Sequence, residues 1–168
     1  MKKILLILFC LPIIVLSQDF TINPYLQNAS PNSITIMWEY SNWEVSFVEW
    51  GNTNTLGNID STTFEITSSP SCLFTAKLTG LQSNTKYYYQ VTTGNSTSVM
   101  FDFYTPSTNI DEVPINIVVM SDMQKSDNNL TKFSEIINDG IIDYVKDNYG
   151  GNTNENLDMI LIPGDLVG

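Results

Sequence analysis

Two aspartates, Asp122 and Asp165, occupy positions at which carboxylates can bind a metal ion. Each follows an apolar run of strand length, Ile115 to Met120 before the first and Leu157 to Ile162 before the second. Ligands of open α/β sheets gather outside the carboxyl ends of the strands, and neighbouring strands lie about 4.8 Å apart. If the two strands are parallel neighbours, both carboxylates can reach one hard or borderline metal ion. The pattern indicates a metal-dependent hydrolase.

The segment between the two strands predicts one amphipathic helix over residues 129–149. Asp127 or Asn128 can cap its start, and Gly150-Gly151 can end it. Strand, helix and strand in this order form the βαβ unit that opens an α/β domain. The apolar positions at helical spacing are Leu130, Phe133, Ile136, Ile137, Ile141, Tyr144 and Val145.

Two parallel strands cannot close a core, so residues 114–168 are expected to form an incomplete α/β domain. Both strands are apolar almost throughout, which is typical of strands covered on both faces. We therefore expect part of the apolar surface at Ile117, Val119, Ile160 and Ile162 to be uncovered.

The chain before this unit predicts an all-β sandwich. Between residues 20 and 104, apolar and polar side chains alternate in short stretches bounded by turn residues. Cys72 belongs to one such alternation and is expected to be a buried small hydrophobe. Residues 107–113 are polar and are expected to link the two domains. The side chains expected in the sandwich core are Trp38, Phe74, Tyr87, Tyr89 and Phe101.

Residues 1–17 have the pattern of a signal peptide. Lys2 and Lys3 precede an apolar run, and small residues precede a cleavage point before Gln18. Lipoprotein processing at Cys10 is disfavoured because the two residues before that cysteine are large. We expect a secreted or periplasmic protein that leaves the membrane after cleavage, in which Cys72 has no intrachain disulfide partner.

The charged residues exclude several functions. The formal net charge is -11, so nucleic acid and anionic lipid are poor partners. All seven cations are lysines, and the sequence contains no histidine. Within these residues, a Ser-His-Asp triad, a Cys-His dyad and a histidine-ligated zinc site are therefore excluded.

Several motifs in this order resemble the purple-acid-phosphatase branch of the metallophosphoesterases. The N-terminal motifs are Pro24-Tyr25-Leu26-Gln27, the strand at 33–38, Glu49-Trp50-Gly51 and a corner over 78–87. The C-terminal motifs are Ser121-Asp122 and Gly164-Asp165. The resemblance implies a fibronectin type III-like domain over 18–106, with Tyr87 as a corner tyrosine bonded to upstream backbone. It also implies that a calcineurin-like phosphoesterase domain begins near residue 114.

The resemblance implies a phosphoester substrate and two divalent or trivalent metal ions, namely iron, zinc or manganese. Asp122 would bind the first ion, Asp165 would bridge both, and Gln124 would be a weaker ligand than the usual histidine. Gly168 replaces the tyrosine that colours true purple acid phosphatases, which favours a metallophosphoesterase without that tyrosinate. Only the first two of five metal motifs are present, so the chain is expected to be C-terminally truncated and inactive by itself.

An interaction module is the alternative. In that case a secreted β-sandwich adhesion domain carries a non-catalytic α/β remnant. Asp122 is then a helix-start or loop aspartate, and Gly164-Asp165 is a plain strand-to-turn exit. The sequence leaves open whether the substrate is a monoester, a diester or a pyrophosphate, and it leaves open the metal identities and the oligomeric state.

Overall fold

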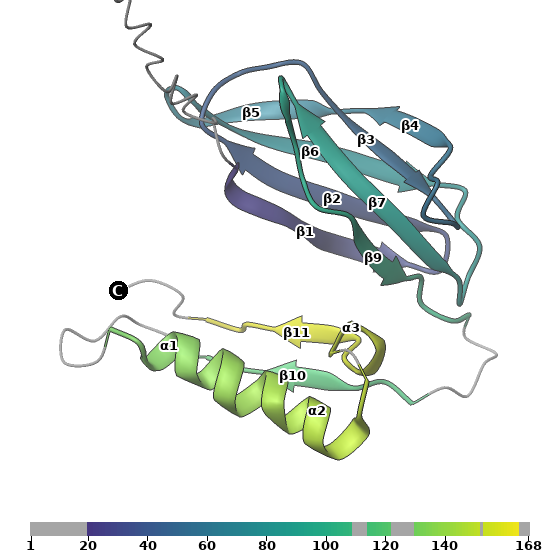
Figure 1. The fold of residues 1–168 in the computed structure, drawn as a ribbon, viewed down its shortest axis with the longest axis vertical. Helices are drawn as coiled ribbons and strands as arrows, with labels where there is room; N and C mark the ends of the chain where they lie inside the picture. The colour runs from purple at the N-terminus through teal and green to yellow at the C-terminus, as the bar shows by residue number, and fades with distance from the viewer. Residues whose placement is uncertain (1–19, 109–113, 122–129, 152, 165–168) are drawn as a thin grey trace, which may run out of the picture.

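The computed structural model of the chain describes residues 20–108, 114–121, 130–151 and 153–164. Within this part, nine strands form a β-sandwich, and a smaller unit with one main helix and a pair of parallel strands follows it (Figure 1). This order of a β-sandwich before a helix and a parallel strand pair confirms the predicted arrangement at that level. The predicted signal peptide and most of the predicted linker lie outside the described residues.

The first sheet of the sandwich is antiparallel, with the strand order β1-β2-β6-β5. Its strands are β1 (Phe20–Ser30), β2 (Ser33–Tyr40), β5 (Thr63–Ser68) and β6 (Ser71–Thr79). Strands β2 and β6 pair without interruption from Ser33 opposite Thr79 to Tyr40 opposite Cys72. This regular pair forms the centre of the sheet.

The second sheet has the order β4-β3-β7-β8, and β9 also pairs with β7. Its strands are β3 (Ser46–Gly51), β4 (Asn58–Ser61), β7 (Lys86–Thr93), β8 (Ser96–Thr97) and β9 (Phe101–Tyr104). Gly94 has a φ of 57° in the two-residue connection between β7 and β8, a conformation that favours glycine in tight hairpins. Strand β7 is the centre of this sheet, because it pairs with β3, β8 and β9.

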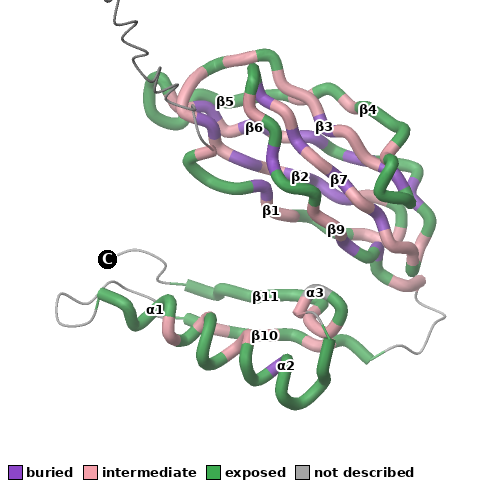
Figure 2. Tube along the Cα trace, viewed as in Figure 1, coloured by how far each residue is buried: buried purple, intermediate pink, exposed green. Residues whose placement is uncertain are grey.

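The core lies between the two sheets and follows the predicted alternation. Trp38 is fully buried and stacks on Phe74, with 5.8 Å between the ring centroids. Its indole N–H donates to the Thr93 hydroxyl at 3.0 Å, which joins β2 of the first sheet to β7 of the second. Cys72 is also buried, as predicted. In Figure 2 the buried positions run along the sandwich strands and are nearly absent from the smaller unit.

The predicted tyrosine corner is present. Tyr87 is buried, and its hydroxyl accepts a hydrogen bond from the backbone N–H of Gln82 at 3.0 Å. Tyr87 stacks on Phe103, and Tyr88 lies half-buried on the opposite face of β7. The neighbouring tyrosines therefore serve packing rather than forming one exposed aromatic platform.

The predicted alternation fails just before β9. Val99 is 71% exposed, and Phe101 is only partly buried against the core. Ser98 occupies the inward position instead, because its hydroxyl accepts from the Val91 N–H at 3.1 Å and its own N–H donates to the Val91 carbonyl. The regular strand therefore begins only at Phe101.

The smaller unit contains the parallel strands β10 (Ile117–Val119) and β11 (Met159–Leu161). The chain between them forms α1 (Lys132–Glu135), the π-helical segment η1 (Ile136–Ile142), α2 (Asp143–Tyr149) and the short α3 (Thr153–Asn156). Gly150 ends α2 with a φ of 71°, as predicted. The predicted start of the helix at Asp127 or Asn128 lies outside the described residues. None of the described helices is both long and apolar enough to cross a membrane.

The predicted apolar stripe of this helix is only partly used. Val145 is buried and Ile137 and Ile141 are half-buried, whereas Phe133 and Tyr144 are exposed. A π-helix bonds i to i+5, so its wider turn changes which side chains face the strands. Two strands are also too narrow to cover the whole stripe.

Candidate metal-binding edge of the α/β unit

Strands β10 and β11 bring two chain segments to one edge of the small sheet. Ile117 lies opposite Met159 and Val119 lies opposite Leu161 in parallel register. The ladder extends one step further, because the Met120 N–H donates to the Leu161 carbonyl at 3.0 Å. This confirms the prediction that the two apolar runs are adjacent parallel strands, although each described strand is only three residues long.

The three predicted metal ligands, Asp122, Gln124 and Asp165, lie outside the described residues. The last described residues before them are Ser121 and Gly164, one after each strand. Because the strands are parallel, Ser121 and Gly164 both follow the carboxyl ends of β10 and β11. The roles assigned to the three side chains stay predictions.

The described part of the chain does not itself contain a metal centre. Among its residues, no three histidine, cysteine, aspartate or glutamate side chains are grouped so that they could hold a metal ion. Asp158 has a structural role at the opposite end of the sheet, where its carboxylate accepts the Asn116 N–H at 2.8 Å.

One face of the small sheet is open. Ile117 and Val119 point to that face, away from the helix, and are 46% and 63% exposed. Ile160 lies opposite Val118 on the helix side but is still 46% exposed, and Ile162 is also exposed. These are the four side chains for which the sequence predicted incomplete cover. Helices on both faces would bury them, but the described helix leaves the face of Ile117 and Val119 open and covers Ile160 only in part.

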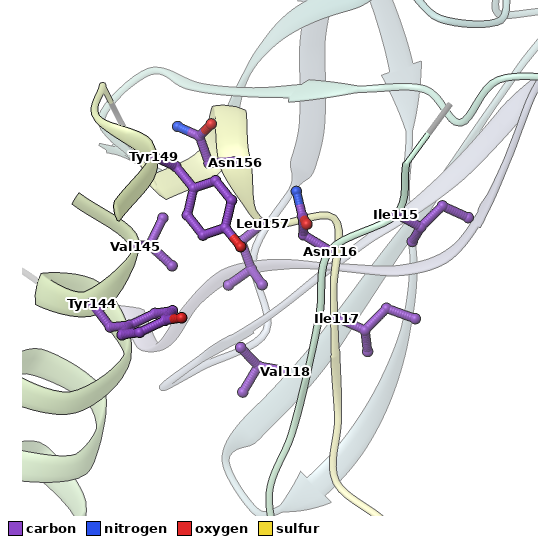
Figure 3. A pocket seen from close by; sticks show the side chains of 9 residues that line it. All are labelled: Ile115, Asn116, Ile117, Val118, Tyr144, Val145, Tyr149, Asn156 and Leu157. Carbon is purple, nitrogen blue, oxygen red and sulfur yellow. The ribbon is translucent and has the colours of Figure 1, made fainter. Parts of the chain in front are cut away.

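A pocket of about 310 Å³ lies on the helix side, at the amino end of the strands (Figure 3). Val118 and Asn116 line it from β10 and its approach, and Tyr144 and Tyr149 line it from α2. The nine lining residues include tyrosine hydroxyls and amides but no carboxylate, lysine or histidine. They offer apolar packing and hydrogen bonding. The sequence did not reveal this pocket, because its shape depends on the π-helical phase of the helix.

Comparison with known proteins identifies the sandwich. A family model described as "Purple acid Phosphatase, N-terminal domain" matches residues 20–105. No curated protein matches the chain.

Several solved structures are similar to the chain at low identity. A structure of PhoD is 15% identical, covers 63% of this chain and has a TM-score of 0.49, and the chain spans only 24% of the PhoD chain. A computationally redesigned β-sandwich protein is 24% identical over 51% of this chain and 92% of its own, with a TM-score of 0.38. The long sensor domain of the anti-sigma factor RsgI4 of Pseudobacteroides cellulosolvens is 15% identical over 58% of this chain and 97% of its own, with a TM-score of 0.44.

These structural likenesses are too distant to support a functional conclusion. The family match is of a different kind, because it extends over β1 to β9 and ends where the sandwich ends. It covers more than half of the 168 residues. The chain therefore belongs to the family of purple acid phosphatase N-terminal domains.

Proposed function

We propose that the protein to which this chain belongs is a secreted, metal-dependent phosphoric-ester hydrolase of the acid phosphatase type. The observation that carries the proposal is the order of the two units. A purple acid phosphatase N-terminal domain is followed by two adjacent parallel strands whose carboxyl ends share one edge. In this proposal, residues 114–168 are the first βαβ unit of a calcineurin-like metallophosphoesterase domain.

The strand pairing supports the choice of the residues proposed to hold metal. Asp122 follows β10 and Asp165 follows β11, so both carboxylates belong to segments at one edge. Asp165 is proposed to bridge two ions, because a carboxylate has two oxygens and can offer one to each. Gln124 is proposed as a weaker amide ligand. When bound, two such ions of iron, zinc or manganese supply Lewis-acid polarisation of a phosphoryl group and a water nucleophile at neutral pH.

The sandwich is proposed to act as a support rather than as a catalyst. Its buried polar groups are already engaged with one another, as Trp38 is with Thr93 and Tyr87 is with Gln82. A signal peptide at residues 1–17 and a linker at 107–113 complete the proposed domain plan, and a phosphoester is the proposed partner. Nucleic acid is disfavoured by the net charge of -11.

The test is phosphate release from a generic phosphomonoester by the complete natural protein. We expect turnover that a chelator abolishes and that added manganese, zinc or iron restores. Without phosphatase activity under any of these metals, the protein would instead fit a secreted β-sandwich interaction module with a non-catalytic α/β remnant.

A further inference from the structure

The outer face of β7 and β9 carries a cluster of charged and aromatic side chains around one lysine. Lys86 lies opposite Tyr104, and Tyr88 lies opposite Asp102, so all four side chains share one face of the second sheet. The Lys86 ammonium lies 3.5 Å from Asp102 Oδ1 and 5.5 Å from the ring centroids of both Tyr88 and Tyr104. We call these four residues the Lys86 cluster.

Lys86 is held firmly in its charged form. Partial burial acts to lower its pKa, but the Asp102 carboxylate and the two tyrosines outweigh that effect and raise the pKa above its ordinary value of 10.5. The Lys86 side chain is only 26% exposed and that of Asp102 only 24%. A partly buried pair is screened less by salt than a fully exposed pair.

A residue of the α/β unit contacts the Lys86 cluster. Glu155 lies on α3, which runs beside β9, and its Oε1 is 3.7 Å from the Lys86 ammonium. The short helix α3 is itself tied to the end of α2, because the Asn156 amide donates to the Gly150 carbonyl at 2.7 Å. A contact at Glu155 is therefore connected through α3 to the end of α2.

The charge balance makes Lys86 the centre of this contact. Two carboxylates, one from each unit, converge on one ammonium group. If Lys86 loses its charge, Asp102 and Glu155 remain as like charges near one another, which favours separation of the two units.

We infer that the Lys86 cluster is the docking surface by which the sandwich holds its own α/β unit, with Glu155 of α3 as the docked residue. The sandwich thereby fixes the orientation of the sheet edge at the carboxyl ends of β10 and β11. The inference goes beyond the proposed hydrolase activity and does not depend on it, because docking can be measured without turnover.

Zero-length carbodiimide cross-linking of residues 18–168 tests the contact directly. The reagent joins an amine to a carboxylate only when the two are in contact. Mass spectrometry should find a peptide in which Lys86 is linked to Glu155, and Glu155→Gln should abolish that product. If only the Lys86–Asp102 product forms, the proposed docking is wrong.

NMR relaxation tests whether the contact holds the units together. In the wild type, both units should share one rotational correlation time. Lys86→Met retains the aliphatic stem between the tyrosines but removes the charge, so the correlation time of the α/β unit should fall below that of the sandwich. Glu155→Gln, which leaves the sandwich untouched, should produce the same fall.

Two matched variants control for general effects. Lys77→Met removes another lysine, exposed on β6 of the opposite sheet, and should leave the common correlation time unchanged. Lys86→Arg should retain docking, because a guanidinium can bond two carboxylates. Independent tumbling in the wild type, or common tumbling that survives both Lys86→Met and Glu155→Gln, would overturn the inference.

Discussion

At the scale of single residues, several stabilising contacts are hydrogen bonds whose polar atoms lie in the sandwich core or at its edge. The Trp38 indole N–H, the Tyr87 hydroxyl and the Ser98 hydroxyl each form a hydrogen bond that an apolar side chain could not form. The corner tyrosine was expected from the family resemblance of residues 78–87. The inward turn of Ser98 could not be predicted, because a small polar residue in a polar stretch gives no sign of where its hydroxyl will point.

We expect Tyr87→Phe to lower the free energy of unfolding of the sandwich by about 1 kcal/mol. The substitution keeps the ring stacked on Phe103 but removes the acceptor of the Gln82 N–H. Urea denaturation followed by tryptophan fluorescence measures the change. Tyr88→Phe on the opposite face is the control and should stay within about 0.5 kcal/mol of the wild type. Equal effects of the two variants would argue against a stabilising corner bond.

Tyr89 should make the sandwich sensitive to alkaline pH. Burial, with a smaller effect from the Asp102 carboxylate, raises the pKa of Tyr89 well above its ordinary value of 10.0. The folded state therefore keeps the proton when the unfolded chain loses it, so the stabilisation is complete below about pH 10 and is lost as the pH rises further. In Tyr89→Phe, the free energy of unfolding should fall less steeply from about pH 10 upward. Parallel curves for the two proteins would contradict this assignment.

At the scale of elements, alternation in the sequence identified the buried faces of β2, β6 and β7 correctly. It could identify faces because a strand places successive side chains on opposite sides. It could not give the register between β7 and β9, which brings Asp102 opposite Tyr88 and Tyr104 opposite Lys86. The Lys86 cluster therefore could not be predicted from the sequence. The helix was predicted, but its π-helical segment was not, because helical periodicity assumes a constant turn.

Two glycines of the helical segment should respond to alanine with opposite signs. Gly140 lies within η1, where an added Cβ would meet nothing closer than 4.0 Å, so Gly140→Ala should stabilise the helix by up to about 1 kcal/mol. Gly150 ends α2 with φ 71° and ψ -178°, a conformation that L side chains rarely adopt. Gly150→Ala should destabilise the unit by about 1–3 kcal/mol.

Amide hydrogen exchange of residues 132–149 separates these two effects. Protection should rise in Gly140→Ala and fall in Gly150→Ala, with protection of the sandwich strands unchanged. A fall in Gly140→Ala would contradict the expected stabilisation of the helix, and unchanged protection in Gly150→Ala would mean that the helix end is not set by the backbone conformation of Gly150.

At the scale of the whole molecule, the two units differ in how well they are packed. The sandwich has a continuous buried core, whereas Val145 is the one buried apolar side chain among the described residues of the smaller unit. The order of the units and the pairing of β10 with β11 followed from the sequence, because long apolar runs and turn residues mark element type. The positions of the ligand side chains did not, because Asp122, Gln124 and Asp165 lie outside the described residues.

Residues 18–168 alone should not hydrolyse phosphate esters. Asp122, Gln124 and Asp165 together offer a charge of about minus two, which poorly balances two cations with four or more positive charges. The sequence has no histidine to protonate a leaving group and no arginine to clamp a phosphate. Assays with added manganese, zinc or iron should stay at background. Turnover that disappears in Asp165→Asn would contradict this expectation.

We propose that Asp165, which follows β11, bridges two metal ions in the complete protein. The most direct test compares kcat/KM for a phosphomonoester among the complete natural protein, its Asp165→Asn variant and its Gln124→Ala variant. Loss of the bridging carboxylate should reduce kcat/KM by about 100-fold or more, whereas water can replace the amide and the loss from Gln124→Ala should be about 10-fold or less. Similar losses in the two variants, or an undiminished rate in Asp165→Asn, would contradict the proposed site.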